Sequence, residues 1–409
     1  MPEKVSSYRW VILSITWMSF LTVFLVRLGI GPLGPFLKES LQISHTQVTA
    51  LSSAIGITYL PALIVAGWLV DRLGIRRVLT FGTFFIGLCT VLLFFASSYQ
   101  DMLIILVLSG VGSGCVFPST TKAIILWFSS KERATAMSIN QTAVNAGGMF
   151  GGILLPPIAV TLGWKYGWLF MGLGTLVISL TCAILYRNPP QEEIPGEADN
   201  VPGRAPKRSA TALMSELLSS RDIWMLFLAG FFMNIVEWGL MVNLALYLWE
   251  ALFFTEIIAG RLLSLTEFAG LLGKPATGLI SDRLLGGRRK IVFMLMAGAA
   301  SVIALVIGLS GDNLQWLLYP TLFLFGMAAI GWGGLYTALA GEMAGKERAG
   351  TIAGISAFTL VLGAFVGPPI FGFIVDTSGS YQAAWLAMAL SGAISMGLMS
   401  LVREHRKRI

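Results

Sequence analysis

The chain has 409 residues, of which 56% are hydrophobic and only 12% are charged, with a net charge of +7 and a mean hydropathy of +0.78. A soluble globular protein carries about 25% charged residues, so this composition excludes an ordinary soluble domain and indicates an integral membrane protein. In such a protein the excess of basic residues reflects membrane topology rather than nucleic-acid binding.

Apolar stretches recur along the whole chain, each long enough to cross about 30 Å of hydrocarbon as a helix of roughly 20 residues. We therefore predict an all-α membrane protein with twelve transmembrane helices. In chain order, the predicted spans are 10–37, 46–70, 76–97, 101–128, 133–161, 166–187, 222–250, 256–281, 289–309, 314–343, 349–375 and 381–402. The start of the chain lacks the cleavage site of a signal peptide, so we expect the first span to be retained.

The basic residues indicate how these spans are oriented. Most of the 28 Lys and Arg residues fall on the side that holds both termini, and such residues accumulate in cytoplasmic loops. We expect a multi-pass protein of the plasma (inner) membrane, with both termini in the cytoplasm, acting as a monomer in the lipid bilayer. The three cysteines lie inside spans without metal-ligand spacing, so we expect no disulfide, metal or cofactor.

A polar, proline-rich stretch with charges of both signs follows the sixth predicted span, at 188–221. This composition predicts a cytosolic linker. The linker divides the chain into 1–187 and 222–409, two parts of nearly equal length, and we expect each part to form a six-helix bundle.

The two parts carry matching motifs. The sequence "GWLVDRLGIRR" at 67–77 is echoed by "GLISDRLLGGRR" at 278–289, an offset of 211 residues (278 − 67). The sequence "KERATAM" at 131–137 is echoed by "KERAGTI" at 346–352, an offset of 215 residues (346 − 131). Two echoes at nearly one offset predict that the two bundles are pseudo-symmetric.

The doubled Gly-x-x-x-Asp-Arg-x-Gly-x-Arg-Arg pattern, set among twelve spans, resembles the signature loop of the major facilitator superfamily over essentially the whole chain. The resemblance implies secondary transport, with a substrate site near the membrane midplane between two rocking halves. Charges at these helix ends can latch one face by charge-assisted hydrogen bonds; the alternative is that they are ordinary loop charges. The expected gating residues are Asp71, Arg72, Arg76, Arg133, Asp282, Arg283 and Arg348.

Ionisable residues inside a span are functional candidates, because each costs at least about 2.5–3.5 kcal/mol near the bilayer centre. The candidates here are Arg27, Lys122, Glu237, Glu267 and Lys274. The two lysines lie near the predicted cytosolic ends of their spans. We favour the interpretation that their side chains extend to the membrane surface. Glu267 fits a proton-coupling role and a structural hydrogen bond equally well.

Arg27 and Glu237 are separated by 210 residues (237 − 27), nearly the repeat offset, so we expect them at similar depth across a central cavity. The arginine fork suits a carboxylate, and burial lets a glutamate exchange a proton near neutral pH. We expect a substrate anion to take Arg27 while Glu237, deprived of its partner, takes a proton. The alternative is that the span ends near Gly29 and Arg27 extends to the membrane surface.

Uncharged polar residues complete the expected substrate site. Tyr59, Asn145, Asn234 and Tyr336 are candidates for substrate contact, with helix packing as the alternative for each. Two pairs of glycines at i, i+4 spacing predict close packing of the moving halves. These pairs are Gly148 with Gly152 and Gly363 with Gly367.

Within the superfamily, Arg27 and the stretches 117–139 and 163–172 resemble the anion:cation symporter group. The resemblance implies that Arg27 binds a substrate carboxylate. Some members carry coupling acids where this chain has Val26 and Ser113, so Glu237 or Glu267 would have to carry the proton. We predict a secondary transporter of a small organic anion with proton symport, not an enzyme. The alternatives are a proton-coupled exporter of lipophilic or cationic compounds and a non-transporting receptor.

Overall fold

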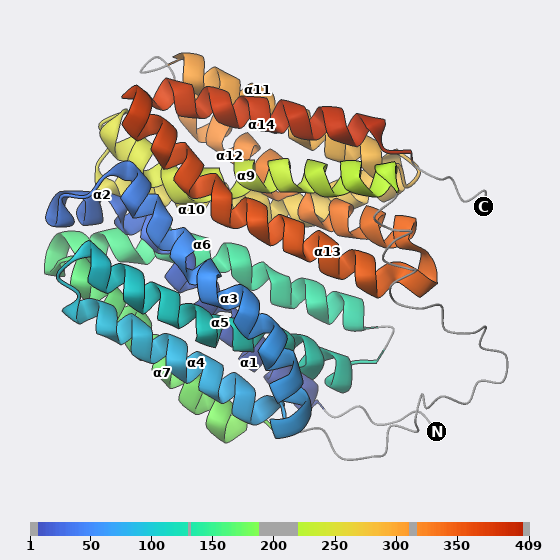
Figure 1. Ribbon diagram of the computed structural model, residues 1–409, viewed down its shortest axis with the longest axis horizontal. Coiled ribbons are helices and arrows are strands. Elements are labelled where there is room, and N and C mark those ends of the chain that lie inside the picture. Colours follow the sequence, from blue (N-terminus) through green and yellow to red (C-terminus); the bar gives the residue numbers. More distant parts are fainter. Residues whose placement is uncertain (1–6, 130–131, 188–219, 311–316, 404–409) are drawn as a thin grey trace.

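The computed structural model describes residues 7–129, 132–187, 220–310 and 317–403, apart from the side chains of 134, 344–351 and 353–354. In this part of the chain the regular elements are all helices, as predicted (Figure 1). The long helices are α1 Tyr8–Leu28, α2 Ile30–Leu41, α3 His45–Leu73, α4 Ile75–Leu92, α5 Tyr99–Trp127, α6 Arg133–Leu162, α7 Trp164–Leu185, α9 Arg221–Glu250, α10 Glu256–Leu279, α11 Arg289–Ser310, α12 Leu318–Ile330, α13 Gly333–Ser378 and α14 Tyr381–Leu401. A short 3₁₀ turn, η1 Leu93–Phe95, and a π turn, η2 Ile280–Leu284, complete the described elements.

Eleven segments of the described chain are long and apolar enough to cross a membrane. The predicted span at 256–281 corresponds to α10, which is a helix of 24 residues but is not one of the eleven. Its composition explains the difference, because Glu267 and Lys274 interrupt its apolar run. Most of the linker expected at 188–221 lies outside the described residues, and Arg221 already begins α9.

The helix of the first span continues through the glycine- and proline-rich stretch that follows Arg27. Gly29 has right-handed helical torsion angles (φ −61°, ψ −19°), and its N–H donates to Leu25 O at 2.9 Å. Leu33 N–H donates in turn to Gly29 O at 3.2 Å, so α1 and α2 form one membrane-length segment, Tyr8–Leu41. The alternative in which the span ends near Gly29 is therefore wrong, and Arg27 stays inside the protein.

The predicted tenth and eleventh spans correspond to the candidate spans Leu318–Met343 and Ile355–Ser378, but the helix breaks are not where they were expected. The chain breaks at Gly331 and Trp332, and the stretch 344–348, expected to be a loop, lies within the 46-residue helix α13. No proline interrupts this stretch, and its Ala, Lys, Glu and Arg residues are good helix formers.

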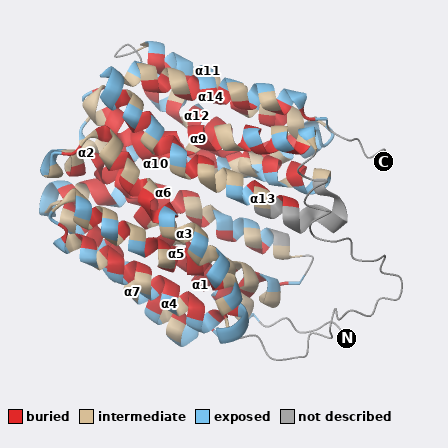
Figure 2. Ribbon diagram, viewed as in Figure 1, coloured by how far each residue is buried: buried red, intermediate tan, exposed pale blue. Residues whose placement is uncertain are grey.

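The buried apolar side chains form two main clusters that follow the sequence. One cluster contains residues between Ile12 and Tyr186 together with Leu246, and the other contains residues between Ile223 and Val402. We call residues 7–187 the N half and residues 220–403 the C half. In Figure 1 the N half lies below and the C half above. Buried residues concentrate where helices face one another, whereas exposed ones cover the outer faces (Figure 2).

The helix ends define two ends of the molecule. Helix α1 begins where α7 ends, because the Tyr8 hydroxyl donates to Leu185 O. Helix α11 begins where α14 ends, because Lys290 Nζ donates to Ser400 O at 2.8 Å. We call this the terminal end, on the right in Figure 1, where both chain ends are marked. The opposite end, where α2 meets the C half, is the far end.

Candidate functional site

Arg27 lies at the junction of the two halves. It is the next-to-last residue of α1, and only 7% of its surface is exposed. Its Nη2 donates to Ala364 O of α13 at 3.0 Å. The guanidinium lies over the ring of Trp238 on α9, 3.6 Å from the centroid, and 4.1 Å from that of Phe365 on α13. A cation from the N half is therefore held by aromatic faces of the C half.

The remaining surroundings of Arg27 leave part of its hydrogen-bonding capacity unused. Tyr59 of α3 is its electrostatic neighbour, and the Tyr59 ring meets Phe365 with centroids 6.4 Å apart. Arg27 Nε is buried without a hydrogen-bond partner among the described residues. A buried, permanently charged fork with a spare N–H is suited chemically to an oxyanion.

The Arg27 guanidinium contacts Ala364 O and two aromatic rings and forms no ion pair with Glu237, so the partnership expected from the repeat offset is wrong. The electrostatic partner of Glu237 is Lys274 of α10, and Trp332 lies within hydrogen-bonding reach. Consecutive residues of an α-helix point about 100° apart, since the helix has 3.6 residues per turn. Trp238 turns toward Arg27 of α1, so Glu237 points about 100° away from that direction around α9.

A polar chain crosses from the N half to the C half through Asn145. Lys274 Nζ donates to Asn145 Oδ1 at 2.6 Å, and Asn145 Nδ2 donates to Glu267 Oε2 at 2.9 Å. Asn145 is 1% exposed and Glu267 is fully buried. The favoured interpretation of Lys274, extension to the membrane surface, is wrong because its ammonium points inward to this chain. The seven-residue spacing of Glu267 and Lys274, which places both on one helix face, was the sequence signal that could have indicated the inward direction of Lys274.

Small residues bring α6 and α10 into close contact beside this polar chain. A Cβ added to Gly148 would lie 2.4 Å from Glu267 Oε1, and one added to Gly152 would lie 2.4 Å from Gly260 O. Ser264 Oγ donates to Met149 O of α6 at 2.8 Å. The prediction that Gly148 and Gly152 pack the two halves together is confirmed.

The second glycine pair packs differently from the prediction. Added Cβ atoms would lie 2.6 Å from Phe231 O at Gly363 and 2.8 Å from Ile235 O at Gly367. Both oxygens belong to α9, which is in the same half as the glycines. These residues therefore join two helices of the C half rather than the two halves.

Two of the expected substrate contacts are engaged within the C half. Asn234 Nδ2 donates to Leu360 O of α13, which ties α9 to α13. Tyr336 is fully buried and its ring packs against Phe293 and Trp332. The structure therefore places Tyr59 and Arg27 against the same ring, that of Phe365, and bonds Asn145 to Glu267. It leaves Asn234 and Tyr336 in the C-half interior.

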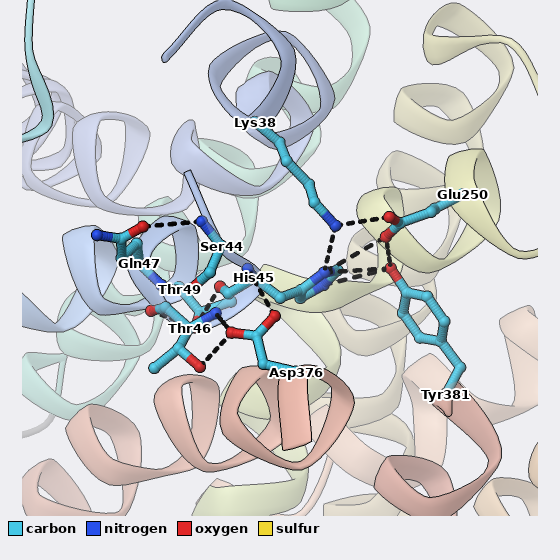
Figure 3. A network of polar contacts seen from close by, with 9 residues as sticks. All are labelled: Lys38, Ser44, His45, Thr46, Gln47, Thr49, Glu250, Asp376 and Tyr381. Atoms are coloured by element: carbon cyan, nitrogen blue, oxygen red, sulfur yellow. Dashed lines mark hydrogen bonds and ion pairs between the residues drawn. The ribbon is translucent and has the colours of Figure 1, made fainter. Parts of the chain in front are cut away.

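A second network, which the sequence did not indicate, joins the halves at the far end (Figure 3). Lys38 Nζ lies 2.5 Å from Glu250 Oε1, and the Tyr381 hydroxyl donates to Glu250 Oε2 at 2.5 Å. The fully buried ring of His45 lies between them, with Nδ1 3.4 Å from Glu250 Oε2. Lys38 and His45 belong to the N half, and Glu250 and Tyr381 belong to the C half.

Asp376 of α13 completes this far-end network at the start of α3. Its carboxylate accepts from His45 N at 3.0 Å, from Thr46 N at 2.8 Å and from Thr46 Oγ1 at 2.6 Å. A carboxylate at a helix N-terminus is stabilised by the unpaired N–H groups there. Ser44 and Gln47 form a capping box that starts this helix at His45.

The expected gating residues of the N half make contacts inside that half at the terminal end. Asp71 pairs with Lys122 at 2.6 Å rather than with an arginine. Arg72 lies over the Trp68 ring. Arg76 and Arg133 each donate a guanidinium hydrogen bond to a backbone oxygen. These bonds run from Arg76 to Ala183 O and from Arg133 to Ile125 O.

Two of the corresponding residues of the C half make fewer contacts among the described residues. Asp282 and Arg283 are exposed in η2 and form no ion pair with any residue that the structure describes. Arg348 lies within α13, but its side chain is outside the described residues.

Comparison with known proteins identifies similar sequences over the whole chain. The sequence model of the Major Facilitator Superfamily matches residues 15–368. A probable sulfoacetate transporter of Cupriavidus necator is 25% identical, covering 96% of this chain and 93% of the relative. The glycerol-3-phosphate transporter of Bacillus subtilis is 28% identical, covering 91% and 87%. A probable galactarate/D-glucarate transporter of Escherichia coli is 25% identical, covering 98% and 96%.

The fold is also similar to solved structures. A bacterial homolog of the human lysosomal transporter Spinster, in an inward-facing and occupied conformation, superposes with a TM-score of 0.76 over 97% of each chain. The two sequences are 16% identical, so the similarity concerns the fold alone.

Proposed function

Because this chain belongs to the major facilitator superfamily, we propose that it is a secondary active transporter that moves a small organic anion by alternating access, with proton symport. The names of the relatives above give their substrates as sulfoacetate, glycerol-3-phosphate, and galactarate or D-glucarate. Each of these compounds is a small molecule with at least one acidic group. Their similarity to this chain along nearly its full length supports an organic anion as substrate.

The observation that carries this proposal is the environment of Arg27. The guanidinium lies between two aromatic rings of the C half and is 7% exposed, with Nε unpartnered among the described residues. A buried cation is strongly disfavoured unless it is paired or serves a site. In our proposal the substrate carboxylate binds Arg27, with Tyr59 beside it.

Proton transfer is assigned to the two acids on the other side of α9. Glu237 and Glu267 share Lys274 as their electrostatic partner, and Glu267 Oε1 is buried without a described hydrogen-bond partner. A carboxylate in such a place is readily neutralised by a proton, because burial disfavours its charge. Asn145 connects Glu267 to the N half, so protonation of Glu267 would alter a contact between the halves.

The proposal includes a membrane arrangement. We assign α10 as a further span beside the eleven, which gives two six-helix bundles, and we place the terminal end in the cytoplasm by its Lys and Arg content. The far-end network then closes the outer face in this structure. The gating residues of the terminal end would latch the inner face in the opposite state.

The test is a thermal-shift comparison of the purified protein with organic acids and organic cations. D-glucarate and sulfoacetate should stabilise the wild type but not Arg27→Met, since the substitution removes the fork that binds a carboxylate. Arg9→Met removes an arginine from the same helix outside the site and should behave as the wild type. Equal stabilisation of Arg27→Met by the anions, or stabilisation of the wild type by cations alone, would contradict the proposal.

A further inference from the structure

A groove lies between α4 and α7, at the edge of the N half that is farthest from the C half in Figure 1. Its volume is about 780 Å³, and small residues line it where the two helices meet, namely Thr80, Ser179 and Ala183. Ser179 Oγ donates to Thr80 O at 3.0 Å, so the two backbones approach closely at this place. We call this feature the α4–α7 groove.

Large apolar side chains form the two sides of the α4–α7 groove. Phe81 and Phe84 of α4 are 50% and 48% exposed, and Leu180 of α7 is 59% exposed. Residues three or four apart lie on one face of a helix, so the two phenylalanines follow the groove along α4. Leu176 and Leu180 follow it along α7 in the same way. In a multi-pass membrane protein these exposed side chains face the acyl chains of lipids.

Two arginines lie where the groove reaches the terminal end of the molecule. Arg76 and Arg77 are the second and third residues of α4. Arg76 Nε donates to Ala183 O at 2.9 Å, which holds its guanidinium beside the last turn of α7. Arg77 is exposed, and its guanidinium has no hydrogen-bond or ion-pair partner among the described residues. The groove therefore begins at the level of the lipid headgroups, with one arginine fixed and the other available.

The lining of the α4–α7 groove has an excess of positive charge. No acidic side chain of the described residues lines it, and Asp71, the nearest acid along the chain, pairs with Lys122 at 2.6 Å. A second surface groove, of about 430 Å³ at the far end, lacks this excess, because Lys38 shares it with Glu39 and Glu250. Two cations without a neighbouring acid favour an anionic ligand.

We propose that the α4–α7 groove binds an anionic phospholipid of the surrounding membrane. The lipid phosphate lies on Arg76 and Arg77, and one acyl chain lies between the apolar side chains of the two helices. A guanidinium binds phosphate through paired hydrogen bonds, and basic pockets between transmembrane helices suit anionic headgroups. The groove is separate from the surroundings of Arg27, so this inference does not rest on the substrate proposed above.

The length of the groove favours a lipid over a small free anion. Phe84 is seven residues beyond Arg77 (84 − 77), and a helix rises about 1.5 Å per residue, so the two are about 10 Å apart along α4. The headgroup region on each side of the hydrocarbon is only about 5–8 Å thick. With the phosphate at Arg77, Phe84 therefore lies at the depth of the acyl chains, and a free anion would leave this apolar part unfilled.

The experiment is native mass spectrometry of the full-length protein with phosphatidylglycerol or phosphatidylcholine of identical acyl chains. The wild type should retain the anionic lipid more tightly than the zwitterionic one. In Arg77→Met, phosphatidylglycerol affinity should fall about fivefold, because one cation near the headgroup is lost, and phosphatidylcholine affinity should change little. The control is Arg72→Met, which removes an exposed arginine of the same end that lies over Trp68. It should bind both lipids as the wild type does.

Three outcomes would overturn the proposal. Equal affinity of the wild type for the two lipids would show that the arginines do not select an anionic headgroup. An equal loss of phosphatidylglycerol in Arg72→Met and Arg77→Met would assign the effect to the net charge of the terminal end. Displacement of phosphatidylglycerol by inorganic phosphate would identify a site for free anions rather than for a lipid.

A second measurement needs only the wild type and so does not depend on the folding of a variant. Phosphatidylglycerol with a photoreactive diazirine in one acyl chain is added to the protein, and the cross-linked peptides are identified by mass spectrometry. Cross-links should concentrate around Phe84 of α4 and Leu180 of α7, and excess phosphatidylglycerol should suppress them more than excess phosphatidylcholine does. Cross-links spread evenly over the exposed faces of the other helices would mean that the groove holds no preferred lipid.

Discussion

The two ends of the molecule use charged residues in different ways. At the far end the charged contacts run between the halves, from Lys38 to Glu250 and from Asp376 to the first N–H groups of α3. At the terminal end the ion pairs stay inside a half. Among the described residues they are Arg9 with Glu132, Asp71 with Lys122, and Arg289 with Glu342.

This difference indicates which contacts change during transport. Ion pairs within a half join helices that move together, so they stabilise that half as a unit. Contacts between halves must break when the halves rock, and those at the far end are numerous in this state. The glycines and Asn145 on α6 lie between the two ends, where the halves touch in this structure.

The largest effect is expected when the far end is locked. In a Thr46→Cys/Asp376→Cys variant, a short bifunctional thiol reagent would join the halves where Thr46 Oγ1 now donates to Asp376. D-glucarate uptake into proteoliposomes should be nearly abolished, since the far end can no longer open, and a reducing agent that cleaves the bridge should restore it. The native Cys89, Cys115 and Cys182 are buried, so background reaction should be low.

The matched control applies the same bridge at the terminal end. Arg289→Cys/Glu342→Cys replaces an ion pair inside the C half, and bridging it should leave most of the uptake intact. If this bridge stops uptake while the Thr46–Asp376 bridge does not, then our division is wrong between contacts that break during transport and contacts that stay intact.

The sequence predicted those parts of the site that depend on one residue in one span. Arg27 stood out as a permanent charge in an apolar run, and helical continuation through Gly29 kept it buried. The repeat offset indicated Trp238 as an aromatic wall of the cavity, but the stacking of Phe365 on Arg27 could not be predicted, because Phe365 comes from a helix 338 residues away (365 − 27). The repeat offset gave the helix on which Glu237 lies but not the direction in which its side chain points.

The far-end network could not be predicted from the sequence for a related reason. Lys38, Glu250 and Asp376 each occur near a helix end, where charged residues are common in any membrane protein. Only the approach of the two halves brings them together. Lys274 was misplaced because extension to the surface is the usual behaviour of such a lysine, and Asn145, which holds it inward, is 129 residues away (274 − 145).

A smaller effect is expected when one far-end contact is removed. Lys38→Met eliminates the ion pair with Glu250, whose side chains are 25% and 34% exposed. A partly exposed pair contributes up to about 1 kcal/mol, so the far-open population should rise about fivefold. The readout is thiol labelling of Leu246→Cys, a fully buried position that packs on Gly34 across the halves.

The control for this variant is Lys165→Met, which removes a lysine from the same end that lies over Trp164. Its labelling rate should match that of Leu246→Cys alone. Equal acceleration by both substitutions would mean that net charge, rather than the Lys38–Glu250 contact, sets the far-end equilibrium.

The smallest effect is expected at the terminal end, where Arg9→Met breaks the pair with Glu132 but keeps an apolar stem beside Phe128. A partly exposed ion pair contributes up to about 1 kcal/mol, so the melting temperature should fall only slightly. Labelling of Leu246→Cys should not change, because both partners belong to the N half. A faster labelling rate would show that this pair contributes to the balance between the two states. The terminal end would then also hold contacts that change during transport.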